Sequence, residues 1–267
     1  MTREPTAAPA GAHRAARSAA RQAGFQPIEQ PEKPPFDFLA DLVLVAALIP
    51  AAPVRAAFPG IPVLSLGGRA PLLAWFSHVR ESCYRDAAGR VRCTRQEGEG
   101  DYTELTLMLL LRNGAFFVPH IEASSALSQR LAHAYYGMPK ALVPAAFGEH
   151  KRRLAVRVAQ SRLEGYRLRG TAPLTVLARA ILPHWTWQAC FPSSGHVRAH
   201  LPWVERVVCI RIHQARLAPQ PPWLPDPIEP LSLGVLLEGA RMRLLPPEQG
   251  PVAERIGHGS HVAWREP

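Results

Sequence analysis

Lysine is rare in this chain, and one lysine lies in a setting that suits chemistry. Only three of its 31 lysine and arginine residues are lysines, namely Lys33, Lys140 and Lys151. Lys33 and Lys151 lie in proline-rich or basic stretches, whereas Lys140 is surrounded by small and apolar residues. A lysine amine can lose its proton and attack a carbonyl to form a Schiff base, which an arginine guanidinium cannot do. Lys140 is therefore a candidate nucleophile; the alternative is a lysine that snorkels at the edge of the core.

An amine nucleophile needs surroundings that help it to lose its proton. A lysine with the usual pKa of about 10.4 is protonated at neutral pH, and burial or a second cation favours the neutral form. Met138 and the apolar residues 141–143 predict burial of Lys140. The residue that follows, Ala141, is neutral, so the local sequence does not supply the second cation.

A carboxylate that could exchange protons with this amine occurs in Tyr102-Thr103-Glu104. Along a strand, Tyr102 and Glu104 share one face because successive side chains alternate. The apolar run Leu105–Leu111 predicts a strand that is buried on both faces. A carboxylate at the start of such a strand is well placed for proton transfer beside a Schiff base. The alternative is that Glu104 pairs with one of the many arginines.

Histidine-containing patterns do not predict a metal site. His120 and Glu122 alternate at the end of a predicted strand, but two ligands do not make a site. Two histidine pairs, at 196/200 and 258/261, have plausible spacing but no nearby carboxylate or cysteine partner in the sequence. The chain also lacks a Gly-x-Ser-x-Gly elbow and a phosphate-binding glycine loop. We therefore expect no metal and no cofactor.

The positive net charge of the chain is compatible with an alternative function, the binding of nucleic acid. The formal net charge is +10, and a basic chain can bind a polyanion. The basic residues are scattered, however, and they often alternate with apolar residues, as in Arg153–Val158. This alternation places arginine on the solvent-exposed face of a strand. We therefore expect no nucleic-acid partner.

The cysteines and the apolar runs predict a reduced, cytoplasmic, soluble protein. Cys83 and Cys93 flank a predicted turn at 86–89 and could form a bridge only in an oxidising compartment. The first apolar run begins near Leu42, behind a long polar stretch that does not resemble a secretory signal. This run is too short to span a bilayer, so we expect no membrane partner.

The elements that would position these residues are mainly strands. Residues 1–35 lack hydrophobic periodicity and predict a flexible tail, and residues 36–267 predict a single domain. The 28 prolines disfavour long helices. Alternating apolar patterns predict strands at Leu72–Arg80, Tyr102–Arg112, Ala115–His120, Leu154–Gln160, Tyr166–Pro173, Val204–Gln214 and Leu233–Leu245. Residues 161–165 are predicted to be the loop of a hairpin.

One helix is predicted immediately before the candidate nucleophile, at Ser124–Tyr135. A serine at either of its first two positions can cap it, and apolar residues at spacing four share one of its faces. Gly137 should end the helix. Lys140 would then follow a helix-to-loop turn and begin an extended apolar segment.

These residues resemble the acetoacetate decarboxylase family. The segment Tyr136-Gly137-Met138-Pro139-Lys140 is similar to the family's aromatic-Pro-Lys segment, which carries the Schiff-base lysine. The segment Tyr102-Thr103-Glu104 is similar to the Tyr-x-Glu that supplies the family's active-site glutamate. The resemblance covers about residues 36–245. It implies a mainly β fold built around a closed, cone-like barrel, with a few short helices, and a homo-oligomer.

The resemblance also implies site residues and a reaction class. Lys140 would be the nucleophile and Glu104 the general acid/base, with Tyr102, Tyr136 and Met138 in contact with the substrate. The reaction would be that of a Schiff-base lyase acting on a small keto acid or keto compound. An iminium accepts the electron pair of a breaking carbon–carboxylate or carbon–hydrogen bond, so both decarboxylation and aldol or dehydration chemistry are implied.

Three departures from the family pattern favour a divergent member. Ala141 stands where the decarboxylases carry a second lysine, and the stretch 38–47 lacks the arginine that grips the substrate carboxylate. His133-Ala134 replaces an Arg-Glu pair. The alternative function is a barrel of the same fold that has lost catalysis and binds a small ligand.

Overall fold

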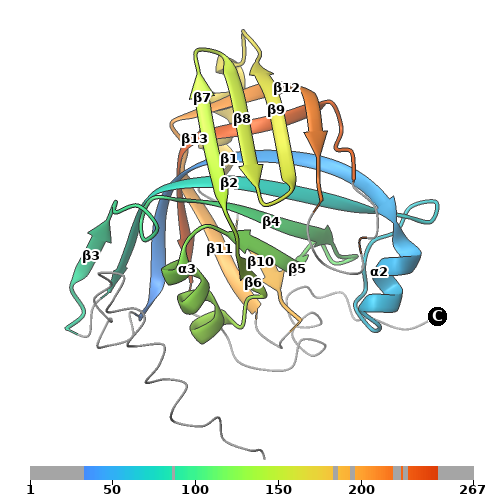
Figure 1. Cartoon of the computed structure of the whole chain (residues 1–267), viewed down its shortest axis with the longest axis horizontal. Helices are drawn as coiled ribbons and strands as arrows, with labels where there is room; N and C mark the ends of the chain where they lie inside the picture. Colours follow the sequence, from blue (N-terminus) through green and yellow to red (C-terminus); the bar gives the residue numbers. More distant parts are fainter. Residues whose placement is uncertain are drawn as a thin grey trace, which may run out of the picture.

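The fold is dominated by strands, and its helices are short (Figure 1). The computed structural model describes residues 33–85, 88–182, 186–192, 196–218, 224 and 228–245 of the 267-residue chain. The predicted tail therefore lies almost entirely outside the described residues. The strands are β1 Lys33–Pro50, β2 Arg69–Arg85, β3 Val91–Thr94, β4 Tyr102–Leu110, β5 Phe116–Ala123, β6 Lys140–Leu142, β7 Ala145–His150, β8 Arg153–Val158, β9 Ser161–Arg167, β10 Thr186–Cys190, β11 His196–Trp203, β12 Arg206–Arg216 and β13 Leu233–Leu244. The helices are α2 Ala51–Ala57, α3 Ala126–Leu131, the π-helix η1 Ala132–Tyr136 and α4 Ala172–Ile181.

The strands form one mixed sheet in the order β1-β2-β4-β5-β10-β11-β13-β12-β9-β8-β7. Strand β13 also pairs with β1, in antiparallel register, so the hydrogen-bonded pairs lead from β1 through the sheet and back to β1. Most neighbours are antiparallel, but β5 pairs with β10 and with β6 in parallel register. The predicted mainly β class is confirmed. The closed, cone-like barrel stays a prediction that the β1–β13 pairing supports.

Strand β4 separates two hydrophobic cores, because its side chains alternate between them. Leu105, Leu107 and Leu109 are buried in one core, which β7, β8 and β9 cover. Tyr102 and Met108 belong to the second core, on the side of α3 and η1. The prediction that this strand is buried on both faces is therefore confirmed.

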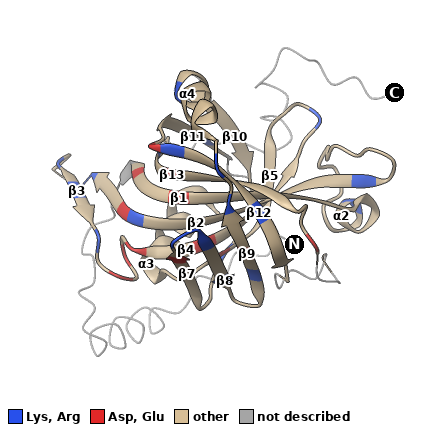
Figure 2. Ribbon diagram, turned by 90° about the horizontal axis from the view of Figure 1, so that it is seen from above, with Lys and Arg blue, Asp and Glu red and all other residues tan. Residues whose placement is uncertain are grey.

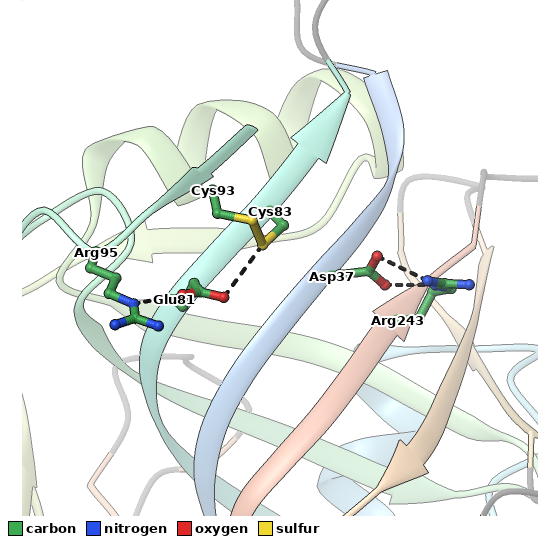
Figure 3. Close-up of a disulfide and its surroundings, with 6 residues drawn as sticks. All are labelled: Asp37, Glu81, Cys83, Cys93, Arg95 and Arg243. Carbon is green, nitrogen blue, oxygen red and sulfur yellow. Dashed lines mark hydrogen bonds and ion pairs between the residues drawn. A yellow bond between two sulfur atoms is a disulfide. The ribbon is translucent and has the colours of Figure 1, made fainter. Parts of the chain in front are cut away.

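The alternating basic stretch is also a strand with one wet face. Along β8, Arg153, Ala155 and Arg157 are exposed, whereas the apolar residues between them are buried. Lysine and arginine lie on many different elements rather than on one (Figure 2). Several of these side chains take part in ion pairs on the surface, such as Arg243 with Asp37 (Figure 3).

The predicted helix before Lys140 is present, but its last turn is wider than expected. Ser125 caps α3, and its side chain accepts a hydrogen bond from the backbone of Ser128 at 3.0 Å. The chain then continues as the π-helix η1 and ends at Gly137, which has a φ of 60°. Glycine adopts this left-handed conformation without the steric cost of a Cβ atom.

Two predictions near β9 are wrong. Residues 161–165 were expected to be a loop, but Ser161 already pairs with Val158, so the turn consists only of residues 159 and 160. The short turn is preferred because it buries Ser161 and Leu163 on the face that continues the β8 core. The strand predicted at Tyr166–Pro173 is present only in its first two residues, since β9 ends at Arg167 and residues 172–181 form α4. A proline in the first turn is compatible with a helix.

The expectation of reduced cysteines is wrong for one pair. Cys83 and Cys93 form a disulfide (Figure 3). They lie directly opposite each other on β2 and β3, with a Cα–Cα distance of 4.1 Å. The register of β2 and β3 places them together, and the sequence pattern alone left this register open. Cys190 and Cys209 are free thiols.

Within the described part of the chain, none of the helices has the length and apolar character needed to cross a membrane.

Candidate active site

Lys140 is the first residue of β6, and backbone contacts hold it on the edge of β5. It lies opposite Ile121 in the parallel β5–β6 pairing, and the Ile121 amide donates to the Pro139 carbonyl at 3.0 Å. The Lys140 carbonyl accepts a hydrogen bond from Gln129 Nε2 at 3.0 Å, and His133 Nε2 lies 2.9 Å from the same oxygen. Lys140 is only 7% exposed, as the apolar sequence around it predicted.

The amine of Lys140 and the carboxylate of Glu104 form a direct ion pair. Lys140 Nζ lies 2.6 Å from Glu104 Oε2 and 2.9 Å from Ser128 Oγ. The other carboxylate oxygen, Glu104 Oε1, accepts a hydrogen bond from the Thr106 hydroxyl at 2.9 Å. The amine therefore lies between a proton acceptor and a hydroxyl, and the carboxylate is held at both of its oxygens.

Tyr102 lies on the same face of β4 as Glu104, as the spacing of two predicted. Its side chain is buried, and this burial raises the pKa of Tyr102 well above its usual value. The negative charge of Glu104 raises the pKa further, since a second anion nearby is unfavourable. Hydrogen bonds with Ser128 and Ser82 lower the pKa by less than burial raises it, so Tyr102 keeps its proton at neutral pH.

Two cavities meet at Lys140. The larger has a volume of about 90 Å³ and is lined by Lys140, Glu104 and residues of six further strands. The smaller has a volume of about 50 Å³ and lies against α3, η1 and the disulfide-bonded Cys83. Tyr102, Met138 and Lys140 line both cavities.

Tyr136 belongs to the smaller cavity alone. Its ring lines that cavity beside Lys140, whereas Glu104 lines only the larger one. Burial, and to a lesser degree Tyr135, raises the pKa of Tyr136 above its usual value. Its buried hydroxyl has no hydrogen-bond partner among the described residues. Of the five site residues predicted from the sequence, Lys140, Glu104, Tyr102 and Met138 therefore share the larger cavity, and Tyr136 lies beyond them.

Comparison with known proteins shows which fold the chain has. The chain matches no protein-family model and no curated protein. Among solved structures, one of acetoacetate decarboxylase superposes with a TM-score of 0.55 at 11% sequence identity, covering 82% of this chain and 90% of that one. The chain has the fold of acetoacetate decarboxylase. The resemblance inferred from the two short motifs is thus confirmed in three dimensions, and the low identity is consistent with a divergent member.

Two further structures share the acetoacetate decarboxylase fold with this chain. The acetoacetate decarboxylase from Legionella pneumophila has a TM-score of 0.52 and 12% identity, covering 83% of this chain and 92% of that one. The enduracididine biosynthesis enzyme MppR, complexed with pyruvate, has a TM-score of 0.51 and 16% identity, covering 85% of this chain and 93% of that one.

The sequence analysis missed four residues that contact Lys140 or Glu104 within this acetoacetate decarboxylase fold, namely Thr106, Ser128, Gln129 and His133. Thr106 could have been found, because it follows Glu104 at a spacing of two on the same strand face. Ser128, Gln129 and His133 carry no such signal. They reach Lys140 only because α3 and η1 pack beside β6, which the sequence pattern does not specify.

The weaker candidate ligands form no metal site in the described residues. His120 Nε2 lies 3.2 Å from Glu122 Oε1, so these two side chains contact each other. Glu81 lies close to both sulfur atoms of the Cys83–Cys93 pair, but those sulfurs are bonded to each other. The side chain of His196 and the whole of His258 and His261 lie outside the described residues.

Proposed function

We propose that this protein is a Schiff-base-forming enzyme, a lyase in which Lys140 attacks the carbonyl group of a small keto compound. The observation that carries this proposal is the buried contact of 2.6 Å between the Lys140 amine and the Glu104 carboxylate. A buried lysine paired with one carboxylate at the wall of a cavity has the nucleophile and the proton acceptor that imine formation needs.

The first step is a proton transfer within the pair. Glu104 Oε2 accepts a proton from Lys140 Nζ, and the neutral amine attacks the substrate carbonyl carbon. In the adduct the nitrogen passes one proton to the oxygen, which gives the carbinolamine. Glu104 then returns its proton to the same oxygen, which leaves as water while the C=N bond forms. One carboxyl group thus acts first as base and then as acid, and Thr106 holds its other oxygen in place.

The neighbouring residues would position the amine and exclude water. Ser128 Oγ holds Lys140 Nζ from the second side at 2.9 Å. Tyr102 is protonated and lines both cavities, so its hydroxyl can donate to the substrate oxygen or relay a proton to Glu104. Met138 also lines both cavities and covers the reacting carbon with an apolar surface.

The iminium formed on Lys140 is an electron sink. It accepts the electron pair released when a bond to the adjacent carbon breaks. That bond can join the adjacent carbon to a carboxylate or to a hydrogen. Structures with this fold include both a decarboxylase and an enzyme complexed with pyruvate, which favours a carbonyl substrate for this chain too. The homo-oligomer implied by the resemblance remains part of the proposal.

Reductive trapping tests the proposal. The protein is incubated with a keto compound and sodium cyanoborohydride, and intact-mass spectrometry then measures the covalent adduct. We expect one adduct per chain on the native protein and none on Lys140→Arg. Lys151→Arg is the matched control, because Lys151 is an exposed lysine in the turn between β7 and β8. It should trap as the native protein does. A native protein whose mass stays unchanged with neutral and acidic carbonyl compounds alike would contradict the proposal.

A further inference from the structure

We infer that the substrate of Lys140 is an uncharged ketone or aldehyde with an aryl or alkyl substituent, rather than a keto acid. This inference rests on the proposed function, and it narrows the substrate class by the lining of the larger cavity. Two charged side chains are found among its described lining residues, and they are Lys140 and Glu104 themselves. The rest of the lining consists mainly of aromatic and aliphatic side chains.

The charges of the cavity are unfavourable for a substrate carboxylate. The positive charge of Lys140, or of the iminium formed from it, already faces the Glu104 carboxylate at 2.6 Å. A second carboxylate would lie close to Glu104 and against apolar rings. A charge that is buried without its own partner is costly, and repulsion by Glu104 adds to that cost.

Strand alternation directs the nearby arginines away from the cavity. On β13, Met242 and Leu244 line the cavity, whereas Arg243 between them is exposed and pairs with Asp37 at 2.6 Å. On β2, Val79 lines the cavity, and its neighbour Arg80 pairs with Asp41 at 3.2 Å. These guanidinium groups are therefore held on the outer face by carboxylates of β1.

An aromatic wall on the inner surface suits the substituent of such a substrate. The rings of Trp75 and Trp187 lie 4.3 Å apart, and Phe116 packs edge-on against Trp187 with a centroid distance of 6.3 Å. Trp75 is two residues from Ser77, which lies opposite Glu104 in the β2–β4 pairing. Two residues along a strand span about 7 Å. Lys140 and this wall line the same cavity, so an apolar substituent on a carbonyl group at Lys140 can lie against the wall.

The reaction then has no carboxylate to lose, so the bond that breaks beside the iminium is a C–H bond. The Lys140 amine, the carbonyl and the proton held by Glu104 give an iminium and water, which leaves Glu104 as a carboxylate. The Glu104 carboxylate removes a proton from the adjacent carbon, and the electron pair of that C–H bond becomes the C=C bond of an enamine. The enamine takes up a proton from Glu104 again, or it attacks a second carbonyl compound in an aldol addition. In D₂O, the first outcome exchanges the hydrogens next to the carbonyl for deuterium.

A matched pair of probes tests the inference. 4-Phenylbutan-2-one and 2-oxo-4-phenylbutanoate share the carbonyl and the phenylethyl group. The ketone carries a methyl group at the position where the acid carries a carboxylate. Trapping with cyanoborohydride is measured as a function of concentration for each. We expect the ketone to reach half-maximal trapping at a concentration about tenfold or more below that of the acid. Native protein should also exchange the α-hydrogens of the ketone in D₂O, detected by NMR, and Lys140→Arg should not.

The outcomes separate this inference from the function on which it rests. Trapping of the acid at an equal or lower concentration than the ketone would overturn the inference and leave the Schiff-base function intact. If neither probe modifies the native protein, the proposed Schiff-base function itself is contradicted. Met242→Arg adds a cation to the cavity wall without adding an amine, and we expect it to shift the preference toward the acid. An unchanged preference in a folded Met242→Arg protein, judged by thermal unfolding, would also count against the inference.

Discussion

Glu104 and Lys140 meet across a strand that lies between them. Glu104 is on β4 and Lys140 on β6, and both strands pair with β5, on its opposite edges. Two strands separated by a third are about 10 Å apart, so only a long side chain can close this gap. The lysine does so, and its Nζ lies 2.6 Å from the carboxylate. An arginine at position 140 could also reach this carboxylate, but its guanidinium cannot lose a proton and act as a nucleophile.

Glu104→Gln should slow imine formation much more than it changes the fold. Glutamine keeps the shape and can still contact Lys140 and Thr106, but it cannot accept the proton of the amine. General acid–base groups typically contribute a factor of about 100 to 10,000, and we expect the trapping rate with 4-phenylbutan-2-one to fall by about 100-fold or more. Glu99→Gln is the control, because Glu99 lines only the smaller cavity. Equal trapping rates for Glu104→Gln and the native protein would exclude Glu104 as the acid/base.

Replacing two serines at the same helix should affect two different properties, the trapping rate in one case and the free energy of unfolding in the other. Ser128 contacts the amine, so Ser128→Ala should reduce the trapping rate by about tenfold, as expected for the loss of a hydrogen bond of about 1.4 kcal/mol. Ser125 caps α3, so Ser125→Ala should lower the free energy of unfolding by about 1 kcal/mol. Urea denaturation and trapping kinetics are measured on both variants. A stability loss without a kinetic effect in Ser128→Ala would assign Ser128 a purely structural role.

The Cys83–Cys93 disulfide should be detectable by counting thiols. Iodoacetamide applied in denaturant without reductant should label the two free cysteines, Cys190 and Cys209, and with reductant it should label all four. The double variant Cys83→Ser/Cys93→Ser should lower the free energy of unfolding by about 2–4 kcal/mol, because the bridge restricts the unfolded chain. Four labelled cysteines before reduction would show instead that this pair is reduced in the purified protein.

The buried thiol of Cys190 should make the free energy of unfolding depend on pH. Burial raises the pKa of its thiol from 9.0 to about 11, so the folded state favours the neutral thiol. Its contribution to stability is therefore fully present below pH 9 and is lost as the pH rises through about 11. The free energy of unfolding, measured in urea from pH 8 to pH 11, should fall less steeply for Cys190→Ala than for the native protein. Cys209→Ala is the control, and an identical slope for native protein and Cys190→Ala would contradict the burial of this thiol.

Local sequence patterns predicted the strand β8 well and the turn after it poorly. The alternation of Arg153–Val158 indicates which face of the strand is exposed to solvent. Polar side chains point to the solvent and apolar side chains to the core, whatever the rest of the fold. The hairpin loop was misplaced because Ser161 is polar yet fully buried. Its hydroxyl accepts a hydrogen bond from the Ala218 amide at 3.0 Å. A contact 57 residues away in the sequence therefore decides where β9 begins.

The sequence by itself determined the mainly β class and the capped helix before Lys140, and it indicated Lys140 and Glu104 as the candidate site residues. These features depend on residue type and on spacing within one element, and both can be recognised in the sequence from alternating apolar residues and from capping residues. Only the tertiary structure decided that the amine and the carboxylate meet across β5, that Ser128 joins them and that Cys83 bonds to Cys93. It also decided that the arginines face outward from an apolar cavity. The reason is physical: strand order and register set which distant side chains converge, and no local pattern carries that information.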